Sequence, residues 1–282
     1  MAKIALVTDS TCNLPGHLLQ QYNIHIAPQV LIWDDQTYAD GVDIQPEQFY
    51  ERLKNSKSMP STSQATPATF QRIFSKLLAE EYQVLAVLIS HKLSGTIQSA
   101  MQVLDGMPGA PVEIVDSNTV SMALGWQVLA AARAIEAGAG LAEARAVAEQ
   151  ARDKVGVVLA VDTLEFLHRG GRIGGASRYL ATALNIKPIL EVVNGRVEAV
   201  ERVRTRTKSL ARLVEIVAEK TCDARPVRLA SLNANSAEEA REVLELARGR
   251  LNAVETFETE VSPVIGAHAG PGTVALAYMA GL

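Results

Sequence analysis

Short, continuous runs of aliphatic residues alternate with helix-like patterns along the first half of the chain. The runs are Ile4 to Thr8, Val84 to Ile89 and Val112 to Val115, and the helical patterns that follow them are Pro15 to Tyr22, Ser94 to Leu104 and Ser121 to Ala137. Strands without polar alternation are typical of a parallel sheet that helices cover on both faces. We therefore predict a Rossmann-like α/β domain with a parallel sheet in residues 1–158.

The segment between the first two of these units is predicted from local signals. Val30 to Trp33 has the composition of a strand, Asp40-Gly41 marks a turn, and Ser58 to Gln64 is expected to be a loop. Thr66 followed by Pro67 is typical of a helix start, with a hydroxyl cap and a proline in the first turn.

The pattern changes in the second half, from about Val155 to Val161 onwards. Asn194-Gly195 separates two apolar stretches, Ile189 to Val193 and Arg196 to Val203, and predicts a β-hairpin. Further strands are expected at Val227 to Leu232, at Val254 to Val261 and as a pair around a glycine turn in the closing VIGAHAGPGTVALAYM. Helices are expected at Ala176 to Leu184, at Ser209 to Glu219 and from a capping box of Ser236 and Glu239 to Arg248. We predict an α/β domain with a mainly antiparallel sheet in residues 159–282.

The composition narrows the class of protein. Of the 282 residues, 48% are hydrophobic but only 5% are aromatic, so few rings are available to stack on nucleic-acid bases. No apolar run approaches the roughly 20 residues that cross a bilayer, and Cys12 and Cys222 lie far apart without a partner motif. These features predict a cytoplasmic protein.

The net charge of −4 conceals a basic segment. From Glu165 to Arg212 there are ten Lys and Arg against four Glu, a balance of +6, which leaves −10 for the rest of the chain. Within the segment, Arg202, Arg204 and Arg206 alternate with other residues, so a strand would present all three on one face. Such a segment can meet nucleic acid, an acidic partner or a phosphate, or it can be a solvated face.

Hydroxyl-bearing residues follow the predicted parallel strands, in Asp9-Ser10-Thr11, in Ser90 to Thr96 and in Asp116-Ser117. Ligands of open parallel sheets bind at this edge, because helix N-termini and loop amides converge there. Ser94 either caps its own helix or donates a hydrogen bond to a ligand oxygen. It is a poor nucleophile, because HKLSGT does not match the G-x-S-x-G pattern of hydrolases.

Two further motifs carry candidate chemistry. The glycine-rich HRGGRIGG, with Arg169 and Arg172, fits neither nucleotide-binding fingerprint, so it is either a phosphate-binding turn or a tight strand-to-helix connection. The five histidines do not cluster at metal-ligand spacing, and no metal site is expected. His268, in IGAHAGPGT, is flanked by small residues that let a ligand or the backbone approach it closely; a core histidine in a turn is the alternative.

Seven segments together resemble the DegV family of bacterial fatty-acid-binding proteins. They span the chain in order: TDSTCNLP (8–15), PSTSQATP (60–67), ISHKLSGTIQSA (89–100), VDS (115–117), LEFLHRGGRIG (164–174), IKPIL (186–190) and VIGAHAGPGT (264–273). The resemblance implies two α/β domains that hold one long-chain fatty acid such as palmitate. The acyl chain would lie in an apolar tunnel of the second domain and the carboxylate at the domain junction, with no cofactor and no catalysis by this chain.

The resemblance also implies which residues meet the carboxylate. By position these are Thr62 and Ser94, with His268 and Arg169 in the surrounding polar network. A buried carboxylate requires donors, so the Gly95 amide and a protonated His268 are further candidates.

The partner implied by the resemblance is a separate fatty acid kinase. It would phosphorylate the bound carboxylate, and this chain would carry the acyl phosphate to phospholipid synthesis, with transient contact to a membrane surface. Arg172 and one of Arg202 or Arg204 would meet the kinase and the phosphate, and no nucleic acid is expected. His168 stands where many relatives carry a first arginine, a change that we interpret as a loss of surface charge.

Two alternatives from other classes remain open at this point. The family is related in fold to dihydroxyacetone kinase, so a small-molecule kinase is one alternative, although the sequence offers no phosphate loop. The other is a regulatory module that recognises nucleic acid or an acidic protein through Arg202, Arg204 and Arg206.

Overall fold

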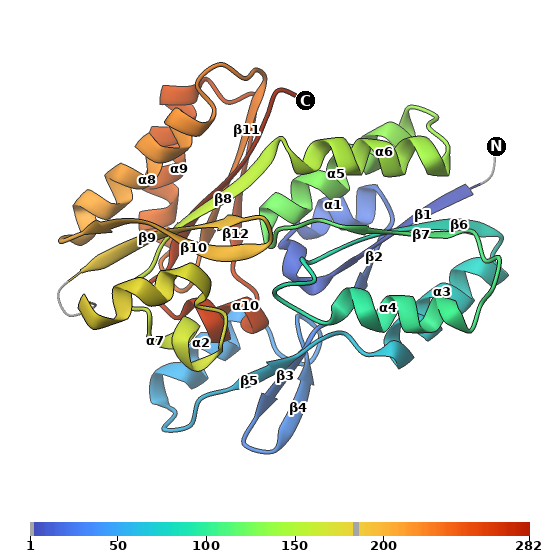
Figure 1. Cartoon of the computed structure of the whole chain (residues 1–282), viewed down its shortest axis with the longest axis horizontal. Helices are drawn as coiled ribbons and strands as arrows, with labels where there is room; N and C mark the ends of the chain where they lie inside the picture. Colours follow the sequence, from blue (N-terminus) through green and yellow to red (C-terminus); the bar gives the residue numbers. More distant parts are fainter. Residues whose placement is uncertain (1–2, 183–185) are drawn as a thin grey trace.

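The computed structural model describes residues 3–182 and 186–282, without the side chains of residues 181 and 182. Its first sheet has four parallel strands in the order β2-β1-β6-β7 (Figure 1). The strands are β1 (Lys3–Asp9), β2 (Ile24–Ala27), β6 (Tyr82–Leu88) and β7 (Val112–Asp116). Helices α3 (Pro67–Ala79) and α4 (Thr96–Asp105) cover one face, and α5 (Met122–Glu136) and α6 (Leu141–Arg152) cover the other. The short η1 (Ser10–Cys12) and α1 (Gly16–Gln21) follow β1.

The second sheet has six strands in the order β10-β9-β8-β13-β11-β12. They are β8 (Val155–Ala160), β9 (Lys187–Val193), β10 (Arg196–Val203), β11 (Val227–Asn233), β12 (Glu255–Glu260) and β13 (Val274–Ala280). Among the described strand pairs of this sheet, only β11–β12 is parallel. Helices α8 (Arg206–Lys220) and α9 (Ala237–Leu251) cover its outer face. The predicted fold class, a parallel sheet followed by a mainly antiparallel one, is confirmed.

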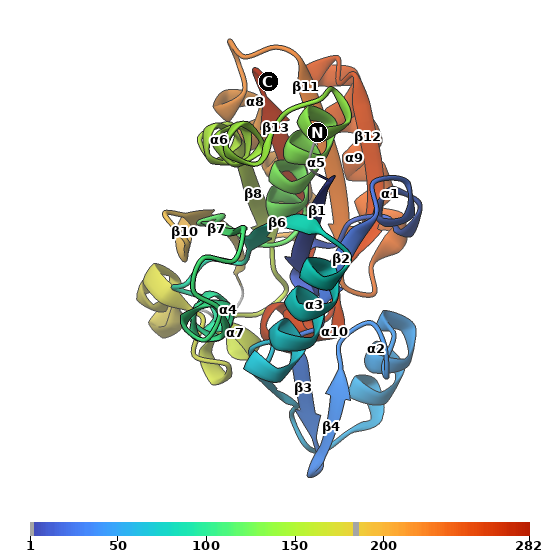
Figure 2. The same ribbon diagram turned by 90° about the vertical axis from the view of Figure 1, so that its right-hand side faces the viewer.

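The two sheets share a hydrophobic core. Helix α5 packs against β1 and β6 of the first sheet and against β8 and β13 of the second (Figures 1 and 2). Along β13, Ala275 and Ala277 face this shared core, whereas Val274 and Leu276 face α8 and α9. Strand β8 lies wholly in the second sheet, so the predicted domain boundary at 158 falls inside a strand, and the division into domains stays a prediction.

A small third sheet projects from the two large ones, at the bottom of Figures 1 and 2. It has the order β4-β3-β5 and is accompanied by α2 (Pro46–Asn55). Its strands are β3 (Val30–Trp33), β4 (Gln36–Ala39) and β5 (Ser61–Ser63). Strand β3 was predicted, but β5 lies in the segment expected to be a loop. Thr66 caps α3 as predicted, since its hydroxyl accepts a hydrogen bond from Thr69 N.

The predicted hairpin is confirmed, because Val193 pairs with Arg196 across the turn. Asn194 and Gly195 have φ of 47° and 77°, the left-handed values that this two-residue turn requires. Between β8 and β9 the chain forms α7 (Glu165–Arg169) and the 3₁₀ helix η2 (Gly174–Thr182). The helix expected at Ala176 to Leu184 is therefore a 3₁₀ helix as far as Thr182, and its last two residues lie outside the described residues.

The prediction for the end of the chain is wrong in one element. The closing segment forms α10 (Pro263–Ala269) and the single strand β13 in place of two strands. Pro263 occupies the first turn of α10, and Gly270, with φ of 78°, ends it. A short apolar run cannot be assigned to helix or strand from its hydrophobicity alone.

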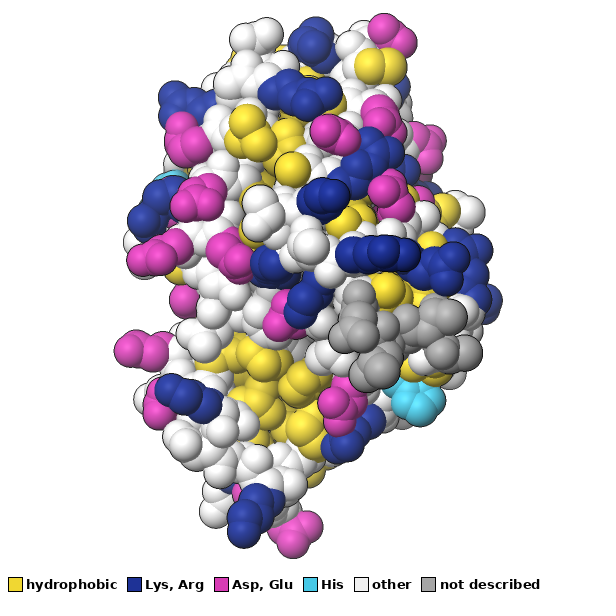
Figure 3. Space-filling view, turned by 90° about the vertical axis from the view of Figure 1, so that its left-hand side faces the viewer, with side chains coloured by type: hydrophobic (Ala, Val, Ile, Leu, Met, Phe, Trp, Pro, Cys, Tyr) yellow, Lys and Arg dark blue, Asp and Glu magenta, His cyan; other side chains and the backbone are white. Residues whose placement is uncertain are grey.

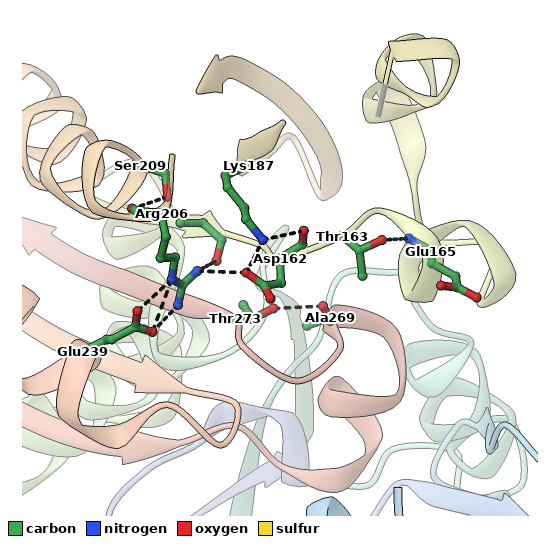
Figure 4. A network of polar contacts seen from close by, with 10 residues as sticks. Asp162, Thr163, Glu165, Lys187, Arg206, Ser209, Glu239, Ala269 and Thr273 are labelled. Carbon is green, nitrogen blue, oxygen red and sulfur yellow. Dashed lines mark hydrogen bonds and ion pairs between the residues drawn. The ribbon is translucent and has the colours of Figure 1, made fainter. Parts of the chain in front are cut away.

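Two local predictions around α8 and α9 are also wrong. Strand β10 ends at Val203 and Thr205 caps α8, so Arg204 and Arg206 lie beyond the strand and do not share a strand face with Arg202. Arg206 instead pairs with Glu239 at 2.5 Å (Figure 4). Because Glu239 binds Arg206, it does not form the capping box expected with Ser236, and the Ser236 side chain makes no cap hydrogen bond. Helix α9 ends at Leu251, beyond the expected Arg248.

Candidate functional site

A cavity lies between the carboxyl edge of the first sheet and the inner face of the second. It encloses about 900 Å³ of space between the atoms, its open mouth included. Most of the side chains that line it are aliphatic, and they come from β8 to β11, β13, α10 and the loops after β6 and β7: Ile89, Leu93, Val120, Val157, Leu159, Val192, Val197, Leu232, Val264, Ile265 and Ala275. An apolar molecule in this cavity would contact mostly aliphatic side chains.

Four of the polar side chains on the cavity wall come from separate parts of the chain. Thr62 lies on β5, Ser94 on the loop after β6, Arg172 after α7 and His268 on α10, and all four line the cavity. Thr62 and Ser94 were predicted to share a site with His268, and the structure brings the three to one cavity.

Thr62 and His268 contact each other directly in the cavity wall, although they lie 206 residues apart in the sequence. Thr62 Oγ1 and His268 Nε2 are 2.7 Å apart. The other ring nitrogen, Nδ1, is buried and has no hydrogen-bond partner among the described residues. No carboxylate among them therefore orients this ring, which separates the pair from a hydrolytic triad.

Burial and the charge of Arg172 lower the pKa of His268 to about 4, so the imidazole is neutral at pH 7. The protonated histidine considered from the sequence is not supported for this arrangement. Gly170 packs directly on the ring, since a Cβ atom at that position would lie 2.1 Å from Nδ1. Part of the glycine-rich motif therefore serves the close packing of α7 against α10.

Ser94 does not cap α4. The helix begins at Thr96, and Gly95 occupies the cap position with φ of −76°, which other residues can adopt. The Ser94 hydroxyl lies 2.8 Å from Thr96 Oγ1. A Cβ atom at position 95 would lie 3.2 Å from Gln64 Cδ, so Gly95 lets the mouth of the cavity pack closely without being strictly required there.

Gln29 is a site residue that the sequence did not reveal. It lines the cavity although only 1% of its surface is exposed. Its amide contacts Thr96 Oγ1 and Ala65 N, and its backbone N–H donates to Ser10 Oγ. A glutamine next to Pro28 between two apolar strands was the only signal, and its partner Thr96 lies 67 residues away.

Two buried carboxyl groups, those of Asp9 and Asp40, are hydrogen-bonded to residues that line the cavity. Asp40 accepts hydrogen bonds from Ser10 Oγ at 2.6 Å and from Val264 N, in the first turn of α10, at 3.2 Å. Burial raises the pKa of Asp40 to about 6. Asp9 accepts from Thr11 and from Ile89 N, and burial raises its pKa as well. The Asp40 bonds tie α10, and so His268, to the edge of the first sheet.

The structure places the two arginines of the glycine-rich motif differently from the expectation. Arg172, expected at a partner surface, lines the cavity and donates to Leu93 O at 3.1 Å and to Gly170 O at 2.9 Å. Arg169, expected near the carboxylate, lies on the surface and pairs with Glu165 at 2.6 Å. Arg172 is therefore the better placed of the two to act on a bound anion.

Arg202 and Arg204 are exposed near the end of β10. The Arg202 guanidinium lies over the Tyr179 ring, 5.3 Å from its centre. On the face drawn in Figure 3, Lys and Arg side chains gather beside an exposed hydrophobic area. No described helix is long and apolar enough to cross a membrane, and within residues 3–182 and 186–282 no three His, Cys, Asp or Glu side chains are grouped so as to hold a metal ion.

The fold and the cavity define a class: α/β proteins that enclose an aliphatic pocket, polar at one end, between two sheets. A model of the DegV family, "Uncharacterised protein, DegV family", matches residues 3–281, and the chain belongs to that family. A DegV domain-containing protein of Deinococcus radiodurans is 38% identical over 274 residues, which is 97% of each chain.

Comparison with solved structures leads to the same family. A DegV family protein of Thermus thermophilus, described for its fatty acid binding, is 34% identical with a TM-score of 0.93 over 99% of both chains. DegV of Bacillus subtilis, described as a fatty acid binding protein, is 30% identical with a TM-score of 0.90 over 99% of this chain and 100% of that one.

Proposed function

We propose that this protein binds one long-chain fatty acid, with the acyl chain in the cavity and the carboxylate at its polar end. The observation that carries the proposal is the joining of an aliphatic cavity to the Thr62, Ser94, Arg172 and His268 side chains. Fatty acid binding by the Thermus thermophilus and Bacillus subtilis relatives supports it.

The apolar part of such a ligand supplies ample free energy. A chain of 16 carbons buries about 14 methylenes, which at about 0.8 kcal/mol each gives on the order of 11 kcal/mol before the cost of ordering. A carboxylate without donors would forfeit much of this. We assign the donors to the hydroxyls of Thr62 and Ser94 and the balancing charge to Arg172, with Arg169 acting only at the surface.

We also propose that the protein presents the carboxylate to a separate fatty acid kinase and carries the resulting acyl phosphate to phospholipid synthesis in the cytoplasm. The kinase would transfer the terminal phosphoryl group of ATP to the carboxylate oxygen and release ADP. Arg202 and Arg204, which are exposed near the end of β10, would meet the kinase, while this chain supplies no catalytic group.

Mass spectrometry of lipids extracted from the denatured protein, purified from a bacterial host, tests the binding. We expect one long-chain fatty acid per chain, and a much smaller amount from the Thr62→Ala/Ser94→Ala double variant. Absence of any co-purified acid, together with no binding of added palmitic acid by the wild type, would contradict the proposal.

The kinase step is tested separately with palmitate-loaded protein, a bacterial fatty acid kinase and ATP. We expect acyl phosphate to form, and a double variant Arg202→Ala/Arg204→Ala to bind palmitate normally while its phosphorylation slows. Normal phosphorylation of that variant would remove the two arginines from the interface, and no phosphorylation of the wild type by any such kinase would refute the carrier role.

A further inference from the structure

Gln29 holds a fully buried amide at the polar end of the cavity, where it contacts a backbone N–H and a buried hydroxyl. Gln29 is 1% exposed and Thr96 is completely buried. Gln29 Oε1 lies 3.0 Å from Ala65 N, and Gln29 Nε2 lies 2.7 Å from Thr96 Oγ1. The pair is closed off from water, so these contacts decide how the hydrogens are arranged.

The orientation of the Gln29 amide is fixed by the backbone. Ala65 N–H can only donate, so the atom that faces it must be the carbonyl oxygen. Turning the amide over would bring two donors together in a buried site. The NH₂ group therefore faces Thr96, and Thr96 Oγ1 accepts a hydrogen bond from it.

Thr96 has one hydroxyl hydrogen and two neighbouring acceptors. Ser94 Oγ is 2.8 Å away, and Gln29 Oε1 is 3.1 Å away and already accepts from Ala65 N. Of the two, Ser94 Oγ is the nearer acceptor, and it accepts no other hydrogen bond from the described residues. The Thr96 hydroxyl therefore donates to Ser94, and Ser94 is left with its own hydrogen.

We propose that Gln29 is a positioning residue that sets the direction of the chain Ala65 N–H, Gln29, Thr96, Ser94, so that the Ser94 hydroxyl donates into the cavity. The inference rests on the proposed function, since it takes the ligand headgroup to lie at Ser94. It makes the site selective for a headgroup that only accepts hydrogen bonds, a carboxylate, over one that also donates, an alcohol.

The fixed direction is tested by comparing palmitic acid with hexadecan-1-ol at pH 8, by displacement of a fluorescent acyl probe. Thr96→Val keeps the shape of the side chain but removes the hydroxyl that orients Ser94, and Thr96→Ser restores it. We expect Thr96→Val to weaken acid binding about fivefold and to leave alcohol binding almost unchanged, because an alcohol can accept from Ser94 or donate to it. Thr96→Ser should behave as the wild type.

A double-variant cycle with Ser94→Ala separates ordering from packing. In the Ser94→Ala background, Thr96→Val should change neither affinity. Equal weakening of acid and alcohol by Thr96→Val, or unchanged acid binding in that variant, would overturn the inference. Failure of the wild type to bind acid, or full binding by Ser94→Ala, would instead refute the headgroup assignment of the proposed function.

Where Thr96→Val does not fold, Gln29→Met provides the same comparison, because it breaks the chain one step earlier. The ratio of acid to alcohol affinity should again fall about fivefold, and an unchanged ratio in a folded Gln29→Met protein would equally overturn the inference.

Discussion

Thr62 and His268 share one hydrogen bond, so the hydroxyl of Thr62 can donate to a ligand only when His268 donates to Thr62. A neutral imidazole carries one hydrogen, and with Nδ1 unpartnered among the described atoms the hydrogen is better placed on Nε2, where Thr62 accepts it at 2.7 Å. Under the proposed function, Thr62 and Ser94 would then both donate a hydrogen bond to the carboxylate, Thr62 because His268 donates to it and Ser94 because Thr96 does.

Removal of either hydroxyl should therefore weaken fatty-acid binding. We expect Thr62→Ala and Ser94→Ala each to raise the Kd for palmitic acid by about tenfold, the loss of one hydrogen bond to a charged group. Ser61→Ala, an exposed neighbour on the same strand, is the matched control. Titration calorimetry measures the three values, and an effect of Ser61→Ala equal to that of Thr62→Ala would show that β5 acts through packing.

The two arginines of the glycine-rich motif offer a second matched pair. Arg172 lines the cavity and Arg169 pairs with Glu165 at the surface. Arg172→Ala should weaken palmitic acid binding at least several-fold by removing a positive charge from the partly buried wall, and Arg169→Ala should leave it within error. The reverse result would restore the assignment expected from the sequence.

His268 should make the stability fall in acid. The folded protein holds its pKa at about 4, below the ordinary value of 6.5, so the unfolded chain binds this proton more readily between these pH values. Stability is lost as pH falls from 6.5 towards 4, by up to about 3 kcal/mol. His268→Gln, which does not titrate, should lack this loss in urea unfolding measured at each pH; parallel curves for the two proteins would contradict the prediction.

Asp40 should act in the opposite direction. Burial raises its pKa from 3.8 to about 6, so the folded protein binds this proton more readily, and stability is lost as pH rises from about 4 to 6, again by up to about 3 kcal/mol. Asn at this position resembles the neutral carboxyl, because its oxygen can accept from Val264 N and its NH₂ can donate to Ser10. Asp40→Asn should therefore gain in stability relative to the wild type between pH 4 and pH 7, and a constant difference would mean that Asp40 does not titrate there.

At the scale of elements, the turn of the β9–β10 hairpin is held against the loop that carries Ser94. Ser90 Oγ donates to Gly195 O at 3.1 Å, and Lys92 Nζ donates to Asn194 O at 2.8 Å. The hairpin belongs to the second sheet, and it thus supports the part of the cavity wall that the loop after β6 of the first sheet forms.

Gly195→Ala tests this contact. A Cβ atom there would lie 2.1 Å from Ser90 Oγ. Gly109 has a similar φ, 79° against 77°, but nothing within 4 Å, so Gly109→Ala carries the same backbone strain without the clash. We expect Gly195→Ala to cost about 1–3 kcal/mol more in urea unfolding than Gly109→Ala and to weaken palmitic acid binding as well. Equal costs for the two variants would show that the hairpin turn is not a packed contact.

The elements that the sequence predicted correctly depend on local signals. Aliphatic runs located β1, β6 and β7, and Asn194-Gly195 located the hairpin. The errors arise where distant residues compete with local ones. Glu239 pairs with Arg206 rather than capping α9, and the small residues before Gly270 pack as a helix against Gly170 through His268.

The same distinction applies to the cavity. Thr62, Ser94 and His268 were found because they stand in motifs of the family, whereas Gln29 and Asp40 were missed. Gln29 acquires its role only from Thr96, 67 residues away, and Asp40 from Val264, 224 residues away. The spacing of residues along the chain does not reveal contacts between residues so far apart.

At the scale of the whole molecule, one hydrophobic cluster joins both large sheets. It contains Leu6 and Leu85 of the first sheet, Leu232 and Ala275 of the second, and Trp126 of α5 between them. Separating the sheets would expose this cluster, so neither sheet has a complete core of its own. The cavity lies at the same junction, and a ligand in it would touch both.

The protein should therefore unfold in a single transition that a fatty acid shifts as a whole. Scanning calorimetry should give equal calorimetric and van't Hoff enthalpies, and free palmitic acid at 100 times its Kd should add about 2.7 kcal/mol to the free energy of unfolding. Hexadecane, which fills the cavity without a carboxylate, is the control and should stabilise less. Two transitions, with only the upper one raised by the acid, would instead mean that the sheets fold as independent domains and that the ligand is held by one of them.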